Sequence, residues 1–265
     1  MKALAVFAVL MAALGASPAK ADDLAPGGTL RAAYLATNPA QAVRDPATGE
    51  TRGASADLAR ELAKRRNLGV ALVPLANPAT VIEAVAKGEV DIGFVAFAPE
   101  RVGTVEFSQV YMLVQQSFIV KDNSRIKSVK DIDAAGLRIS AGAGDSIALY
   151  LKRKLKNTTL IETDNTPADA KKKFAANEID AFGANRQRLT TMLKDMPGYH
   201  ILPDSLFGVT QTIIVPKDKT AALETVNRFI DDVRASGFLQ SAVEKSGIIG
   251  LSVAPAGSWT PSVPD

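Results

Sequence analysis

Short apolar strands alternate with helices along almost the whole chain, and this alternation constrains the fold more than any other feature. Leu58 and Leu62 stand one helical turn apart on an expected helix, and Gly88 is a good residue to end the next one. In the first part of the chain, strands are expected at 29–34, 70–73 and 91–95, and helices at 55–66 and 78–87. A β-α-β-α-β order predicts a mostly parallel sheet with helices on both faces.

The middle of the chain repeats this pattern. Strands are expected at 116–120, 137–140, 159–162 and 181–184, and helices at 128–132, 145–155, 167–177 and 187–195. An extended segment at 207–215 leads to two further helices at 221–236 and 239–246. Two similar α/β units joined by extended segments predict two lobes with a cleft between them. Residues 255–265 are rich in Pro, Ser and Gly, which predicts a poorly ordered tail.

The first 21 residues have the pattern of a secretion signal. Lys2 gives a positive start, and the apolar run at 3–14 is too short to span a bilayer. Ala19-Lys20-Ala21 is an A-x-A-type cleavage site, so the mature chain is expected to begin at Asp22. The alternative, a membrane anchor, is disfavoured by the run length and the small residues that follow. We therefore expect a soluble protein exported to the periplasm of a two-membrane bacterium.

The composition excludes several kinds of site. The chain has no cysteine, which excludes disulfides, zinc–thiolate sites and cysteine nucleophiles. His200 is its one histidine, in an expected turn, and no Gly-x-Ser-x-Gly elbow is present, so neither a metal site nor a triad is expected. Loss of Lys2 and Lys20 with the signal lowers the formal charge from +3 to +1. Charge therefore gives no reason to expect a nucleic-acid or membrane partner, and we expect no cofactor.

Two segments could bind a ligand on the evidence of their residues alone. Arg101 follows a strand and a Pro-containing turn, where a guanidinium either grips a ligand carboxylate or pairs with a neighbouring glutamate. Residues 141–146 lie between a strand and a helix, as a dinucleotide fingerprint does, but Ile147 replaces its third glycine. Free amides of this helix N-terminus facing a cleft are the better interpretation, with Asp145 either a helix cap or a ligand contact.

Four motifs occur in one order: 53–59 (GASADLA), 88–92 (GEVDI), 99–101 (PER) and 105–111 (VEFSQVY). This order resembles the periplasmic solute-binding proteins of the polar amino-acid type (family 3, type II two-lobed fold), and the resemblance covers nearly all of 27–250. It implies two α/β lobes joined by a two-segment hinge, with lobe one at 22–114 plus 212–254 and lobe two at 115–211. It also implies a monomer that closes on a small-molecule solute and is read by the membrane permease of an ABC importer.

The resemblance implies ligand-binding positions in lobe one, and some of them are altered. The family's arginine, which holds the ligand α-carboxylate, is Arg101. The family usually has Thr or Ser before it, but Ala96 stands there, followed by Phe97, so only the backbone can contribute. The first loop, beginning at Asn38, lacks the aromatic residue that usually covers the ligand.

Positions in lobe two are altered as well. Where the family places Gly-Ser or Gly-Thr for the carboxylate, this chain has Gly144 and Asp145, with Ser146 next. The family's ammonium-binding Asp is replaced by Asn185, which can accept a hydrogen bond but supplies no charge. An Asp145 that faces the cleft would repel a carboxylate in the usual pose. We hypothesise that the ligand is not an ordinary α-amino acid in that pose; a small polar solute, an amino-acid derivative or a cationic amine is easier to place.

Three functions remain open. The first is a non-enzymatic solute-binding protein whose mechanism is hinge closure. The second is an enzyme on the same scaffold resembling cyclohexadienyl dehydratases, which need a carboxylic acid in the cleft, with Asp145 as the acidic candidate. The third is a sensor that docks, loaded with solute, to a receptor rather than to a permease.

Overall fold

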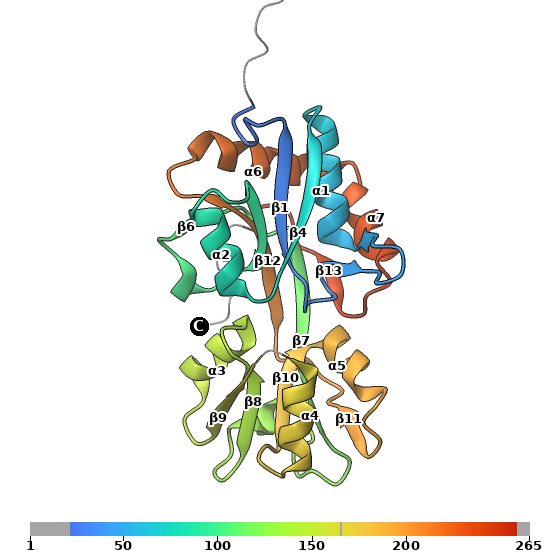
Figure 1. The fold of residues 1–265 in the computed structure, drawn as a ribbon. Coiled ribbons are helices and arrows are strands. Elements are labelled where there is room, and N and C mark those ends of the chain that lie inside the picture. Colours follow the sequence, from blue (N-terminus) through green and yellow to red (C-terminus); the bar gives the residue numbers. More distant parts are fainter. Residues whose placement is uncertain (1–21, 165, 259–265) are drawn as a thin grey trace, which may run out of the picture.

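The computed structural model describes residues 22–164 and 166–258 and has two lobes connected by two long strands (Figure 1). The connecting strands are β7 (Met112–Lys121) and β12 (Gly208–Pro216). This arrangement confirms the predicted two-lobed α/β fold. The predicted signal segment and residues 259–265 of the predicted tail lie outside the described residues. No helix in the described ranges combines the length and apolar character needed to cross a membrane.

The sheet of lobe one joins parallel strands from the first part of the chain to an antiparallel hinge strand. β1 pairs in parallel with β4 and β5, and β5 pairs antiparallel with β12. Helices α1 and α6 cover one face, with α7 against both, and α2 covers the other face. The bounds are β1 Thr29–Leu35, α1 Ala54–Arg65, β4 Gly69–Leu75, α2 Pro78–Ala86, β5 Ile92–Ala96, β6 Val105–Phe107, α6 Thr220–Ala235, α7 Phe238–Lys245 and β13 Leu251–Val253.

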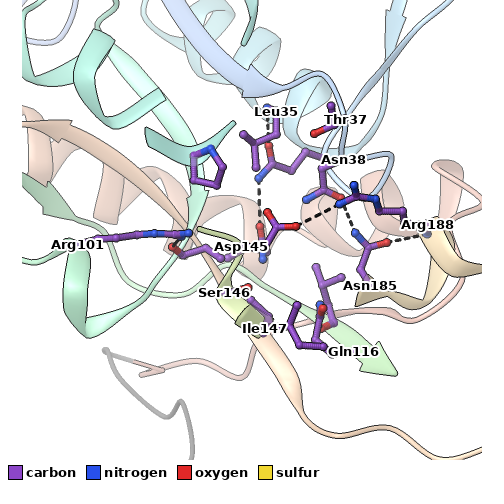
Figure 2. A pocket seen from close by; sticks show the side chains of 16 residues that line it. Leu35, Thr37, Asn38, Arg101, Gln116, Asp145, Ser146, Ile147, Asn185 and Arg188 are labelled. Atoms are coloured by element: carbon purple, nitrogen blue, oxygen red, sulfur yellow. Dashed lines mark hydrogen bonds and ion pairs between the residues drawn. The ribbon is translucent and has the colours of Figure 1, made fainter. Parts of the chain in front are cut away.

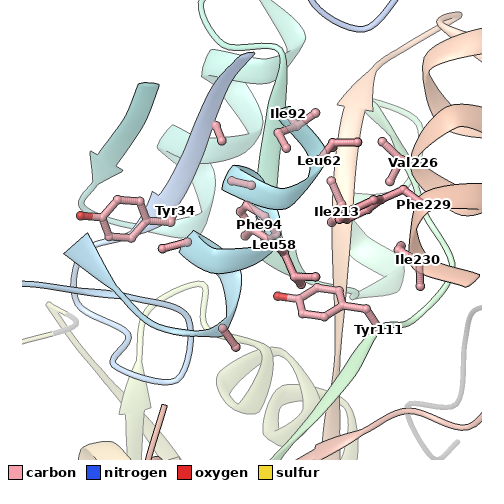
Figure 3. Packing of buried hydrophobic residues seen from close by; sticks show 14 of the residues in the cluster. Tyr34, Leu58, Leu62, Ile92, Phe94, Tyr111, Ile213, Val226, Phe229 and Ile230 are labelled. Atoms are coloured by element: carbon pink, nitrogen blue, oxygen red, sulfur yellow. The ribbon is translucent and has the colours of Figure 1, made fainter. Parts of the chain in front are cut away.

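The core of lobe one packs α1 and α6 onto the sheet, as Figure 3 shows. Leu58 and Leu62 are both buried, as their spacing predicts. The ring of Tyr111 lies edge-on to Phe94 with centroids 6.0 Å apart, and its hydroxyl is 3.0 Å from Oγ of Ser55. This bond satisfies the buried hydroxyl, and burial raises the pKa of Tyr111.

Lobe two repeats the arrangement. β8 pairs in parallel with β9 and β10, while β10 and β11 both pair antiparallel with the hinge strand β7. Helix α3 and the short 3₁₀ helix η2 bury side chains on one face, and α4 and α5 do so on the other. The bounds are η2 Val129–Asp133, β8 Arg138–Gly142, α3 Ser146–Lys154, β9 Thr159–Thr163, α4 Pro167–Ala175, β10 Ala181–Asn185, α5 Arg186–Leu193 and β11 Tyr199–Ile201.

Each lobe contains an equivalent ion pair between an arginine and an aspartate. In lobe one, Arg31 at the start of β1 donates two side-chain bonds to Asp91, which precedes β5. In lobe two, Arg138 at the start of β8 binds Asp180, which precedes β10, in the same way. Each aspartate also accepts a bond from the backbone amide of its arginine. The same clamp thus ties neighbouring parallel strands in both lobes.

The hinge lies where β7 exchanges partners. Its residues Met112 to Gln115 pair with β12, and Gln116 to Val120 pair with β10 of lobe two. β12 in turn pairs with β7 up to Gln211 and with β5 from there on. Among the described strands, β7 and β12 carry the chain between the lobes, so rotation about these two strands would change the gap between the lobes.

Some local details differ from the sequence expectations. The turn at 45–50 closes a short hairpin of β2 (Val43–Arg44) and β3 (Thr51–Arg52). His200, expected in a turn, lies in β11 with its Nδ1 3.0 Å from Asp122. Of the predicted tail, the structure describes 255–258, where Ser258 accepts a backbone hydrogen bond from Val110.

Candidate functional site

A small cavity lies between the lobes, beside the hinge strands. Its volume is about 40 Å³. A water-sized group needs about 10–15 Å³, so the cavity has room for about three such groups. A larger hollow of about 480 Å³ lies beside α1 and α7, but it belongs to lobe one alone. The small cavity is lined by Leu35, Thr37, Asn38, Gln41, Pro78, Ala96 and Arg101 from lobe one, by Asp145, Ser146, Ile147, Asn185 and Arg188 from lobe two, and by Val114, Gln116, Val209 and Gln211 from the hinge strands (Figure 2).

The cavity brings together most residues proposed from the sequence. The six that line it are Asn38, Ala96, Arg101, Asp145, Ser146 and Asn185. Phe97 does not line it, since its ring lies edge-on to Phe107 with centroids 5.2 Å apart. Gly144 does not line it either, but its carbonyl oxygen takes part in a contact between the lobes.

Arg101 is buried and faces the interior, not the surface. It is the last residue of the 3₁₀ turn η1 (Pro99–Arg101), and the residue is 7% exposed. Its Nη1 donates to the carbonyl of Ala96 and its Nη2 donates across the cleft to Gly144. Burial lowers the pKa of Arg101 to about 10, against the opposing effect of nearby Asp145. The guanidinium therefore stays protonated at neutral pH.

The sequence analysis considered Asp145 either as a helix cap or as a ligand contact, and the structure shows a third arrangement. Asp145 occupies the position before α3 but makes no side-chain capping bond. Instead its Oδ2 lies 3.1 Å from Nη1 of Arg188, and Figure 2 shows its carboxylate between Arg101 and Arg188. Burial raises the pKa of Asp145, while the charges of Arg188 and Arg101 oppose that rise. The side chain remains 24% exposed, so it can contact a solute in the cavity.

Arg188 is the charged residue that the sequence analysis missed. It stands in the first turn of α5, its side chain is 7% exposed, and its guanidinium lies 5.8 Å from the ring centre of Phe182. A signal was present: the helix begins directly after a strand whose last residue, Asn185, was already a candidate. Arginine one turn into such a helix can reach the same edge of the sheet.

Asn185 uses both ends of its amide. Its Oδ1 accepts from the backbone amide of Arg188 at 2.8 Å, which caps α5. Its Nδ2 donates across the cleft to Oδ1 of Asn38 at 2.9 Å. The Asn185 side chain therefore caps the N-terminus of α5 in lobe two and also contacts the first loop of lobe one.

Two glutamines near the hinge were also missed. Gln41 and Gln211 are both buried, and Nε2 of Gln41 lies 3.3 Å from Oε1 of Gln211. Gln41 also accepts a bond from the backbone amide of Leu35. This pair gives the hinge side of the cavity a neutral polar wall.

Comparison with known families identifies the chain. The model of the bacterial extracellular solute-binding proteins, family 3, matches residues 30–247, which is most of the chain. This range includes both lobes and the hinge strands. It also includes all sixteen residues that line the cavity.

Individual relatives and structures agree with the family. A glutamine-binding protein of Geobacillus stearothermophilus is 30% identical over 167 residues, which make up 62% of this chain but only 63% of that protein. The ABC transporter glutamine-binding protein GlnH of Bacillus subtilis (strain 168) is 25% identical over 200 residues, 74% of this chain and 72% of its own length. The structure of an ancestral arginine-binding protein bound to glutamine is 25% identical, with a TM-score of 0.70 over 82% of this chain and 97% of that one. This chain therefore belongs to the bacterial extracellular solute-binding proteins of family 3.

Proposed function

We propose that this protein is the solute-binding component of an ABC importer and captures a small polar, amino-acid-like solute by closing its two lobes. The observation that carries the proposal is the cavity at the hinge, which both lobes line with polar side chains. The two curated relatives, named as glutamine-binding proteins, support a solute of this class. The proposal places the protein in the periplasm, as a monomer that delivers its solute to a membrane permease.

Closure is supported by polar contacts that cross the cleft. Besides the bonds from Arg101 to Gly144 and from Asn185 to Asn38, Glu100 of lobe one forms an ion pair with Arg153 of α3. These contacts exist only when the lobes are close together. A solute that touches both lobes adds to them and shifts the population toward the closed form. A permease that recognises the closed form would then distinguish loaded from empty protein.

A thermal-shift screen of the purified protein tests this function. A solute present at 100 times its dissociation constant should stabilise the folded state by about 2.7 kcal/mol. We expect such a shift from at least one amino acid, amino-acid derivative, amine or small organic acid. A folded protein that shows no shift with any of these solutes would contradict the proposal.

An enzyme on the same scaffold is the second candidate, and one observation favours it. Burial raises the pKa of Asp145 in the cleft, as a proton donor requires. The adjacent cations of Arg188 and Arg101 act in the opposite direction, which favours the binding function. Turnover of prephenate or arogenate by the wild type, lost in Asp145→Asn, would establish the enzyme instead.

A further inference from the structure

Among the residues that the structure describes, three charged side chains line the cavity. Of the sixteen lining residues, Arg101 and Arg188 are cations and Asp145 is an anion, while the others are neutral. The cavity lining therefore carries a net charge of +1 when all three are ionised. This balance differs from the one expected from the sequence, in which Asp145 had no cationic neighbour besides Arg101.

Both guanidiniums are largely removed from water. Arg101 is 7% exposed as a whole residue, and the side chain of Arg188 is 7% exposed. Arg188 forms an ion pair with Asp145, whereas the hydrogen bonds of Arg101 go to two backbone carbonyls, which carry no full charge. The single Asp145 carboxylate lies near both guanidiniums, so one of the two buried positive charges is left uncompensated, which is costly. A solute with one net negative charge would neutralise the closed cavity, whereas a cationic amine would raise its net charge to +2.

The size of the cavity limits the solute further. With a volume of about 40 Å³, the closed cavity accommodates only a few non-hydrogen atoms. Pro78, Leu35 and Ile147 occupy other parts of its wall, and none of the described residues that line it is aromatic. A long side chain would have to hold the lobes apart and would weaken the contacts between them.

We propose that the solute is a short carboxylate of net charge −1, that Arg188 together with Arg101 neutralises it, and that Asp145 limits the site to one negative charge. This inference rests on the proposed function and specifies its solute. Arg188 is then a specificity-determining residue, because its charge reverses the effect that Asp145 alone would have. The Asp145–Arg188 pair also positions Arg188 when no solute is bound.

Calorimetric titration of the purified protein, expressed with its own N-terminal segment, tests the preference for a solute of net charge −1. The probes are glycolate (−1), malonate (−2), glycine (zwitterionic) and ethanolamine (+1). We expect glycolate to bind tightest. Tighter binding of glycine, malonate or ethanolamine would overturn this inference while leaving the binding function intact. Absence of binding by all four probes, and by the wider screen above, would contradict the proposed function itself.

Variants then test which residues cause the preference for net charge −1. Arg188→Gln should weaken glycolate binding on the order of 30-fold or more, as loss of a buried charge partner does. Asp145→Asn should strengthen it, because a competing anion is removed. Lys194→Gln is the matched control, since this exposed lysine at the end of α5 undergoes the same charge change away from the cavity.

Arg188→Gln leaves Asp145 without its partner and could impair folding. The double variant Asp145→Asn/Arg188→Gln avoids this problem, because neither position is then charged. It should bind glycolate at least tenfold more weakly than Asp145→Asn, by the same charge argument. Equal affinities of these two variants, or tighter glycolate binding by Arg188→Gln than by the wild type, would overturn the role of Arg188.

Discussion

Nδ2 of Asn185 lies 2.9 Å from Oδ1 of Asn38, and this hydrogen bond joins the two lobes beside the cavity. The other end of the Asn185 amide caps α5 through the backbone of Arg188. One side chain therefore connects the first loop of lobe one to the helix that carries Arg188. At the position where related proteins are expected to have an ammonium-binding Asp, this chain has a residue engaged in holding the structure together.

Asn185→Ala should lower both stability and solute affinity. Loss of the helix cap costs about 1 kcal/mol of unfolding free energy, and loss of the bond to Asn38 weakens the closed form. Thr166→Ala is the control, because Thr166 caps α4 through the amide of Asp169 without contacting lobe one. Chemical denaturation and calorimetry should show similar stability losses in the two variants and weaker binding only in Asn185→Ala. Equal affinities would mean that the contact between the lobes contributes nothing to closure.

The pH dependence of stability should reveal the buried Asp145. Burial raises its pKa above the ordinary value of 3.8, so the folded state binds more protons than the unfolded state in the window above 3.8. Folding stability from this group therefore falls as the pH rises through that window. Asp145→Asn removes the dependence, so its stability relative to the wild type should increase from acid to neutral pH.

Asp133→Asn provides a control of opposite sign. Hydrogen bonds from the backbone amides of Asn157, Lys156 and Thr158 lower the pKa of Asp133, against the opposing effect of burial. Its stabilising contribution is present above the unfolded pKa and is lost as the pH falls. Denaturant titrations at several pH values should therefore give opposite slopes for the two variants. Parallel slopes would contradict the assigned environment of Asp145.

The ion pair between Glu100 and Arg153 should affect binding more than folding. Both side chains are about one third exposed, so the pair contributes at most about 1 kcal/mol. Glu100→Gln should weaken solute binding up to about fivefold at low salt and have less effect at high salt. Glu83→Gln breaks a pair with Lys87 at the C-terminal end of α2 and should leave affinity unchanged. A loss of thermal stability without any loss of affinity in Glu100→Gln would show that the pair does not act in closure.

Gly183→Ala should disturb the wall of the cavity. A methyl group there would lie 2.7 Å from a ring carbon of Phe118 and 2.8 Å from Cδ1 of Ile147, which lines the cavity. Such overpacking costs about 1–3 kcal/mol of stability. Gly93→Ala creates similar contacts with Val81 and Val85 in lobe one, away from the cavity. Both variants should lose stability, but a larger loss of affinity is expected only for Gly183→Ala; equal binding losses would mean that Ile147 does not shape the site.

The regular elements were predictable because they depend on local pattern. The helix expected at 78–87 begins at Pro78 after the capping residue Asn77, and Gly88 follows it with a positive φ of 69°. The expected strand at 116–120 was too short, since β7 begins at Met112. Its first residues pair with β12, almost a hundred positions away, and no local pattern shows that pairing.

The site was predictable in position but not in charge. Ala96, Phe97 and Arg101 were expected at the cleft from the family resemblance, and residues 144–146 from the free amides of a helix N-terminus. Arg188, the ion-pair partner of Asp145, was not expected at the cleft, because it lies 43 positions further along the chain and arginine on a helix is usually exposed. Phe97 shows the opposite error, since its side chain turns from the cavity to pack on Phe107.

Closure of the lobes on a solute is the central claim, and a distance measured between them tests it most directly. The chain contains no cysteine, so Val102→Cys in lobe one and Lys156→Cys in lobe two, both exposed, can be spin-labelled without interference. Double electron–electron resonance with glycolate, or with whichever probe gives the largest thermal shift, should show the distance distribution becoming shorter and narrower. An unchanged distribution at a saturating concentration of a solute that calorimetry shows to bind would contradict closure.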